Sequence, residues 1–185
     1  MLQNVLRLLA ALVLIGCAVI ALAGPRPAAA EPAAPRIVDP PDPLLLKQIR
    51  RYQRQTWRLQ RLMGVRRSPT SGTKVRNREY GLWVRNLWHK RAAHAWIRWQ
   101  RPPRRSAWLC IHSHEGAWTD PNAPYYGGLQ MDISFQHTYG RELLRRKGTA
   151  DNWTPLEQMW VAERAYRSGR GFYPWPNTAR YCNLI

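Results

Sequence analysis

The sequence predicts a mainly α-helical protein in which a basic helical hairpin precedes a small, mostly helical domain. Apolar side chains recur at helical spacing in several segments, and no segment shows the alternation typical of a strand series. The charge also divides the 185 residues, because positions 36–106 hold 19 basic and three acidic side chains, whereas positions 107–185 hold eight and seven. A polycationic region therefore precedes a near-neutral one, within a length that suits one domain plus additional segments.

The first 23 residues have the pattern of an export signal. Arg7 precedes an apolar run over residues 8–23, which is short for a membrane-spanning helix and typical of a signal-peptide core. We expect a cleaved signal peptide or a retained signal anchor, and Cys17 in "LIGC" leaves a lipoprotein signal as a third possibility. Each predicts a secreted, extracellular protein associated with the cell wall, or one anchored to the membrane by the N-terminal segment.

Residues 24–43 are rich in Pro and Ala and are predicted to form an extended linker. Residues 44–101 then follow a basic, Trp-containing helical pattern. The apolar stripe of the first helix comprises Leu45, Ile49, Tyr52, Leu59 and Met63. A second helix is expected from about position 78 to 99, with an apolar side of Tyr80, Trp83, Val84, Leu87 and Trp88. The two helices can pack as a hairpin or lie as amphipathic helices on an anionic surface.

Residues 107–185 are predicted to form short helices around an irregular loop or short hairpin. Ser106 is expected to cap a helix that Gly116 ends. Asp132 or Ser134 is expected to start a helix toward position 139. The clearest helix starts at Thr154, where Pro155 and Glu157 complete a capping box, and it ends near position 169. Its inward side chains are predicted to be Leu156, Met159, Trp160 and Tyr166.

Cys110 and Cys182 are the two cysteines outside the predicted export signal, and export would let them form a disulfide. An oxidising compartment favours a disulfide between them, which would close a loop around nearly the whole near-neutral region. On the chain-entropy model such a bond stabilises the fold by about 4 kcal/mol. Two buried free thiols are the alternative.

Glu115 lies in an unusual neighbourhood for so basic a chain. Between positions 80 and 141 the acidic residues are Glu115, Asp120 and Asp132. An acid at a helix end, shielded from water by Trp108 and Trp118, can stay protonated near neutral pH. It can then donate its proton to a leaving oxygen, as the cleavage of a glycosidic bond requires. A surface glutamate beside a structural aromatic cluster is the alternative.

The motifs "CIHSHEGAW", "YYGGLQMD" and "WPNTARYC" together resemble the transglycosylase-like domain of resuscitation-promoting factors, in the lysozyme-like superfamily. The resemblance covers about residues 107–185 and excludes the basic region. The matching positions are Cys110, Glu115, Trp118, Tyr126, Gly127, Gly128, Leu129, Gln130, Trp175, Pro176 and Cys182. The chain differs in placing Cys110 five positions before the glutamate, and Gly116 and Ala117 alone before Trp118.

The resemblance implies an α+β lysozyme-like catalytic domain that cleaves the β-1,4 glycan bond of peptidoglycan. Glu115 would be the general acid and base, with no cofactor, in a protein that we expect to be monomeric. The attacking group would be water, giving hydrolysis, or the muramyl 6-hydroxyl, giving an anhydro product. The sequence leaves this choice open. A non-catalytic glycan-binding module is the alternative.

Several side chains are predicted to contact the substrate. Trp118, Tyr125 and Tyr126 offer flat faces on which pyranose rings can stack, and the bare backbone of Gly127 and Gly128 would let a polymer approach. Gln130 can bond a substrate amide or cap backbone groups.

Two further acids are open to more than one role. Asp132 is a second candidate for the site, but its position also suits a helix N-cap. Asp120 is predicted to form an Asx turn.

A metal site is not expected. His112 and His114 point about 160° apart on a helix and cannot share a metal ion. Cys110 and His114 could share one, but two ligands make a weak site.

The basic region has three possible partners. Anionic wall polymers and membrane headgroups fit an exported enzyme that must stay on its substrate. Nucleic acid, with arginines on phosphates and tryptophans on bases, is one alternative, and a solvated helical hairpin without a binding role is another.

Overall fold

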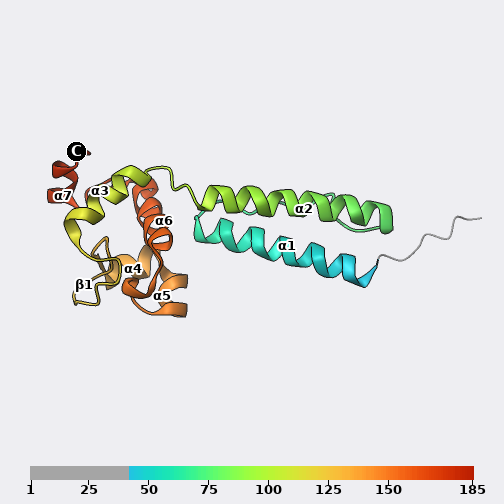
Figure 1. Ribbon diagram of the computed structural model, residues 1–185, viewed down its shortest axis with the longest axis horizontal. Coiled ribbons are helices and arrows are strands. Elements are labelled where there is room, and N and C mark those ends of the chain that lie inside the picture. The colour runs from blue at the N-terminus through green and yellow to red at the C-terminus, as the bar shows by residue number, and fades with distance from the viewer. Residues whose placement is uncertain (1–41) are drawn as a thin grey trace, which may run out of the picture. The chain divides into compact units, whose positions relative to one another are not determined.

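The computed structural model describes residues 42–185, so the predicted export signal and residues 24–41 of the predicted linker lie outside it. The described chain is mainly helical, as predicted, with one very short antiparallel pair of strands (Figure 1). None of its helices combines the length and the apolar character that a bilayer crossing requires. The elements are α1 (Pro43–Leu62), α2 (Arg78–Trp99), α3 (Arg105–Glu115), β1 (Tyr125–Tyr126), β2 (Met131–Asp132), α4 (Ile133–Tyr139), α5 (Arg141–Lys147), α6 (Pro155–Ala165) and α7 (Pro176–Tyr181).

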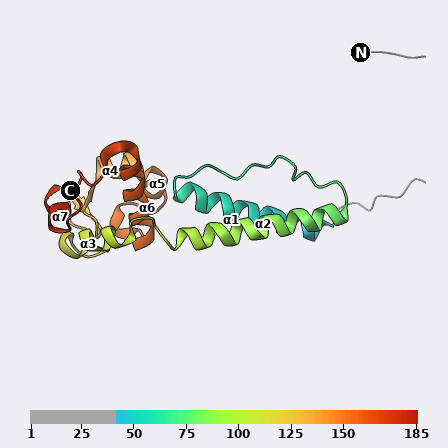
Figure 2. The ribbon, with the colours of Figure 1, turned by 90° about the horizontal axis from the view of Figure 1, so that it is seen from above.

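The two basic helices pack side by side and run parallel, so the predicted hairpin, in which the helices would be antiparallel, is wrong (Figure 1). Both helices start at one end of this helix pair and finish at the other, because the connection over residues 63–77 is long enough to return along α1 (Figure 2). Pro43 occupies the first turn of α1, where no intrahelical partner for its nitrogen is needed, and the Asp42 side chain accepts a bond from Leu44 N at 2.8 Å. The helices run side by side in both views (Figures 1 and 2). Their contact buries a cluster of four large side chains, Leu45, Ile49, Val84 and Trp88.

The predicted apolar side of α2 is wrong at one position, because Trp83 is 52% exposed. Val84 and Trp88 lie four residues apart and face α1, whereas Trp83 is rotated by about 100° from Val84. Its ring stacks on Tyr80 instead, with the ring centroids 5.3 Å apart.

The C-terminal ends of α1 and α2 are part of the core of the C-terminal region. Five of its residues belong to the same buried cluster as α3, α4 and α6, namely Leu59, Leu62, Met63, Ala95 and Trp99. Trp160 in α6 stacks on Trp99 and donates its indole N–H to the Trp99 carbonyl at 2.8 Å. The basic region and the C-terminal region therefore form one compact unit with a continuous core.

Helix α3 begins at Arg105, one residue before Ser106, which was the predicted N-cap. Ser106 lies inside the first turn, and Arg104 occupies the N-cap position without a side-chain cap. Its backbone N–H donates instead to the buried carboxylate of Glu163 in α6 at 3.0 Å. The predicted Ser106 cap is wrong because this contact from a distant helix satisfies the N-terminus.

Two predicted helix starts are confirmed. Thr154 and Glu157 form both bonds of a capping box at the start of α6. The Asp132 side chain accepts the backbone N–H of Phe135 at 2.6 Å and caps α4. Asp132 also ends β2, which pairs with β1 in an antiparallel register that places it opposite Tyr125.

Cys110 in α3 and Cys182 at the end of α7 form a disulfide, as predicted, with Cα atoms 6.1 Å apart. The bond joins positions 72 residues apart and connects the first and last helices of the C-terminal region.

We predict that reduction of this bond lowers the free energy of unfolding by about 4 kcal/mol, because the unfolded chain regains the entropy of the closed loop. Urea denaturation of the oxidised and reduced protein measures the difference. The Cys110→Ser/Cys182→Ser variant is the control and should match the reduced protein. Two alkylatable thiols in the native protein would contradict the assignment.

Candidate active site

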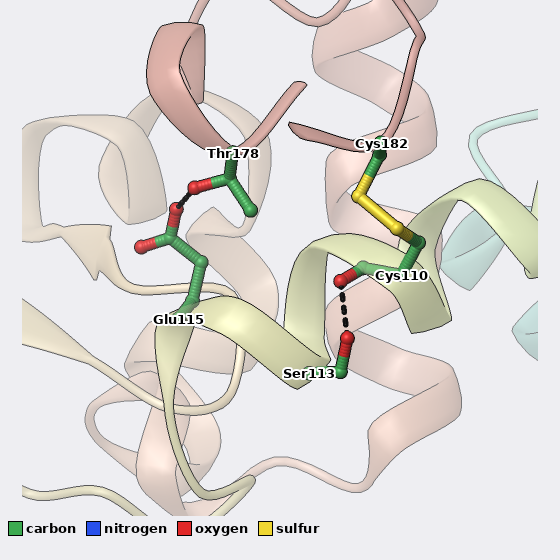
Figure 3. Close-up of a disulfide and its surroundings, with 5 residues drawn as sticks. All are labelled: Cys110, Ser113, Glu115, Thr178 and Cys182. Carbon is green, nitrogen blue, oxygen red and sulfur yellow. Dashed lines mark hydrogen bonds between the residues drawn. A yellow bond between two sulfur atoms is a disulfide. The ribbon is translucent and has the colours of Figure 1, made fainter. Parts of the chain in front are cut away.

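Glu115 is the last residue of α3, and its side chain is half-buried. The hydroxyl of Thr178 in α7 donates a hydrogen bond to Glu115 Oε1 (Figure 3). The disulfide joins the same two helices a little more than one turn earlier on α3 (Figure 3). Two connections between α3 and α7 therefore fix the position of the Glu115 carboxyl group.

A cavity of about 350 Å³ opens beside this carboxyl group. A second cavity of about 200 Å³ adjoins it, since the two share Tyr125, Gln130, Pro174 and Trp175 as lining residues. The first cavity is completed by His114, Glu115, Pro176, Asn177 and Thr178. The second is completed by Met131, Asp132, Ser134, Phe135, Thr138 and Arg170. Together they form a depression that runs from Glu115 to Asp132 and Arg170.

Three of the five predicted substrate-contact residues line this depression, and two do not. Tyr125 is 50% exposed at its edge, Gln130 lies at the junction of the two cavities, and Asp132 lines the second. Trp118 stacks on His112 instead, with ring centroids 3.9 Å apart. Tyr126 packs half-buried against the hydrophobic core.

The aromatic wall beside Glu115 comes from Trp175, to which the sequence analysis assigned no substrate contact. Trp175 is 4% exposed, and its indole N–H donates to the Leu129 carbonyl at 2.6 Å. Trp108, expected to shield Glu115, is fully buried and donates its indole N–H to Glu163 at 2.8 Å. Trp175, 60 positions after Glu115, therefore lies beside the carboxyl group, where Trp108 and Trp118 were expected.

The two glycines of the loop serve packing rather than substrate access. A Cβ at Gly128 would lie 2.5 Å from His112 Nδ1 and 2.8 Å from the Trp118 ring. Gly127 has a φ of 73°, and a Cβ there would lie 2.6 Å from Gln158 Oε1. Both positions need glycine because side chains of the core pack directly against the backbone.

Thr178 was not among the predicted site residues, although the sequence contains a signal for it. Thr178 precedes Cys182 by four residues, so a helix through this segment places both on one side. Since Cys182 is bonded to α3, the same side of α7 faces the end of α3, where Glu115 lies.

Asp120 has a structural role, as predicted. Its Oδ1 accepts the backbone N–H of Asn122 at 3.1 Å, and its Oδ2 accepts Gln130 Nε2 at 2.8 Å. The same Gln130 nitrogen donates to the Gly127 carbonyl at 3.0 Å, which is the backbone-capping alternative for that side chain. The Asn122 backbone bond, followed by the Gln130 bond, lowers the pKa of Asp120 below its usual 3.8.

A three-residue cluster brings Cys110, His114 and Cys182 together, with potential ligand atoms within 4.8 Å of one another. Both sulfur atoms belong to the disulfide, so neither is available as a thiolate ligand. His112 is directed elsewhere, with its Nδ1 3.2 Å from the Gly128 carbonyl.

The chain matches no family model, no curated protein and no solved structure in the comparisons with known proteins.

We predict a pH dependence for the loop around Asp120. Because the folded pKa lies below the unfolded one, the carboxylate stabilises the loop above pH 3.8, and this stabilisation is lost as the pH falls through the folded pKa. The protection of the Asn122 amide against hydrogen exchange, relative to the intrinsic rate at each pH, should therefore fall on acidification. Asp120→Asn keeps an acceptor but does not titrate, so its exchange should lack this step. A step of equal size in Asp120→Asn would assign it to another group.

Proposed function

We propose that this protein is an exported glycosidase that cleaves the β-1,4 glycan bond of peptidoglycan, with a lysozyme-like C-terminal domain. The observation that carries the proposal is the carboxyl group of Glu115, held by the Thr178 hydroxyl beside a cavity walled by Tyr125 and Trp175. The resemblance of residues 107–185 to the transglycosylase-like domain of resuscitation-promoting factors supports it. Association with the cell wall and a monomeric state belong to the same proposal.

The geometry of Glu115 suits an acid that later serves as a base. Thr178 donates to Oε1, which leaves Oε2 as the atom that can carry a proton toward the cavity. In the first step that proton moves to the glycosidic oxygen as the C–O bond breaks. In the second step the carboxylate takes a proton from the attacking hydroxyl, either of water or of the muramyl C6.

One carboxyl group has to serve both steps. Glu115 is the one acid among the described residues that line the first cavity, of about 350 Å³. Asp132 lines the adjoining cavity, and one of its oxygens is engaged by the Phe135 N–H at 2.6 Å. Asp132 therefore suits a contact with a sugar hydroxyl farther along the depression better than a second catalytic role.

Sugar rings have two aromatic surfaces in the depression. The half-exposed ring of Tyr125 and the small exposed part of Trp175 line both cavities, so one glycan strand in the depression can contact both residues. A non-catalytic glycan-binding module would use the same two rings, and it is the competing function that the first test must exclude.

We predict that Glu115→Gln abolishes cleavage of purified peptidoglycan while the fold and glycan binding persist. The amide keeps the shape and can accept the Thr178 bond, but it cannot supply a proton. General-acid catalysis alone contributes about 10²–10⁴-fold, and a residue that serves as acid and base should contribute more. Mass spectrometry of the released sugars measures the reaction.

The matched controls are Asp120→Asn and Asp132→Asn, which remove the same charge at neighbouring positions and should retain cleavage. Released fragments that end in reducing muramic acid would indicate hydrolysis, and fragments lighter by one water would indicate lytic transglycosylation. Binding without release by the folded wild type would identify a binding module. Full activity of Glu115→Gln would exclude Glu115 as the catalytic group.

A separate prediction concerns Thr178 as a positioning residue. Thr178→Val keeps the volume but removes the donor, so kcat should fall about tenfold with KM nearly unchanged, as the loss of one hydrogen bond implies. Thr178→Ser keeps the hydroxyl and should restore kcat. Equal kcat for the Val and Ser variants, with unchanged melting temperatures, would show that the bond does not position Glu115.

A further inference from the structure

We infer that the open side of the parallel helix pair α1 and α2 is a binding cleft for a linear phosphodiester polymer without bases, such as a polyol phosphate. The cleft has a volume of about 630 Å³ and lies where α1 and α2 meet α5 and α6. Its lining contains three arginines of α1, Arg51, Arg54 and Arg58, together with Trp96 of α2 and Lys147 of α5. This site is separate from the cavities beside Glu115, and the inference does not depend on the proposed catalytic role.

The three arginines are free to take an anionic ligand. None of Arg51, Arg54 and Arg58 forms an ion pair or a side-chain hydrogen bond within residues 42–185, and all three are exposed. The neighbouring cations are already paired, since Arg61 contacts Glu142 at 2.8 Å and Lys147 contacts Glu157 at 2.7 Å. Unpaired guanidinium groups present two parallel N–H donors each, which match the geometry of a phosphate.

The cations form a line rather than a point. Lys47, Arg51, Arg54 and Arg58 follow one another at intervals of four, three and four residues, which places them along one side of α1. At 1.5 Å per residue the line is about 16 Å long. A single phosphate would contact one or two of these groups, whereas a chain of phosphodiesters can follow all of them.

The opposite side of the helix pair is closed by the connection between the helices, residues 63–77, which runs back along α1 (Figure 2). Gln60 bonds Ser68 through both of its amide atoms, at 2.8 and 2.9 Å, and Arg91 donates to the Pro69 carbonyl at 3.0 Å. Gln60 follows Arg51 by nine residues and therefore points to the opposite side of α1. The connection leaves the side with Arg51 open.

The distribution of aromatic and apolar groups favours a polymer without bases. Trp96, 51% exposed, lines the cleft and an adjoining depression of about 320 Å³. This depression continues along the helix pair to Tyr52 and His89. One exposed indole can cover the apolar part of a repeat unit, whereas single-stranded nucleic acid is held by successive stacking platforms. A membrane surface would instead contact apolar groups that project to a common level, but this site is concave.

The test measures binding of the full chain to a fluorescent synthetic poly(glycerol phosphate) by anisotropy at several salt concentrations. Arg51→Gln/Arg54→Gln/Arg58→Gln should weaken binding by about 10- to 100-fold, the loss expected from a few charge-assisted contacts. The dependence of log K on log salt should become shallower by about two to three ions. The matched control, Lys74→Gln/Arg76→Gln/Arg78→Gln, removes three charges near the start of α2, at the other end of the helix pair. It should weaken polymer binding by less than about threefold.

Several outcomes would overturn the inference. Equal losses in both triple variants would mean that net charge alone attracts the polymer. Tighter binding of a single-stranded oligonucleotide of equal charge, lost in Trp96→Ala, would identify a nucleic-acid site. Binding to anionic phospholipid vesicles without binding to the free polymer would identify a membrane surface. Cleavage of small soluble muropeptides should be the same in both triple variants, so a failure here is distinguishable from a failure of the proposed function.

Discussion

The buried carboxylate of Glu163 is the contact on which the arrangement of the C-terminal region depends. Glu163 is fully buried and accepts three bonds, from the backbone and the guanidinium of Arg104 and from the indole of Trp108. Burial of an unpaired charge is so unfavourable that removal of one partner from such a pair typically costs about 3–5 kcal/mol. The start of α3 is therefore bound strongly to α6, at a distance of more than 50 residues along the chain.

This contact is the first of three that position Glu115. Glu163 holds the first turn of α3, the bond to Cys182 holds its middle, and the Thr178 hydroxyl meets the carboxyl group at its end. The wall of the cavity is coupled to the same core, because the Trp108 and Trp175 rings lie 5.2 Å apart in an edge-to-face contact. A short helix with no side-chain cap of its own is thereby fixed at both ends by tertiary contacts.

The sequence was informative where the deciding interaction is local or covalent. The capping box at Thr154 and the Asp132 cap follow from neighbouring residues, and the pairing of the two cysteines was expected from the predicted export signal. The sequence was misleading where a distant group decides. Ser106 is the better local cap, but the N-cap position is held by Arg104, two residues earlier, whose backbone N–H donates to Glu163.

The candidate site shows the same division. Glu115 was singled out by its position after a helical segment, but its neighbours in the structure are Thr178 and Trp175, which lie 60 or more positions away. Trp118 is close in sequence, yet its ring stacks on His112 because Gly128 leaves room for it there. Which of several aromatic residues faces a cavity depends on packing between elements, and a single sequence contains no direct signal for it.

The Glu115 carboxyl group differs in its bonding partner from three other glutamates of this basic chain. Glu142, Glu157 and Glu163 each pair with a cation, whereas Glu115 forms no ion pair within residues 42–185 and is bonded to a neutral hydroxyl. A guanidinium in contact would hold the carboxyl group in its charged form. A hydroxyl can accept from a protonated carboxyl or donate to an ionised one, so it supports both forms. Arg170 lines the adjoining cavity, and no arginine or lysine of residues 42–185 lines the cavity beside Glu115, which suits the acid and base role proposed for that carboxyl group.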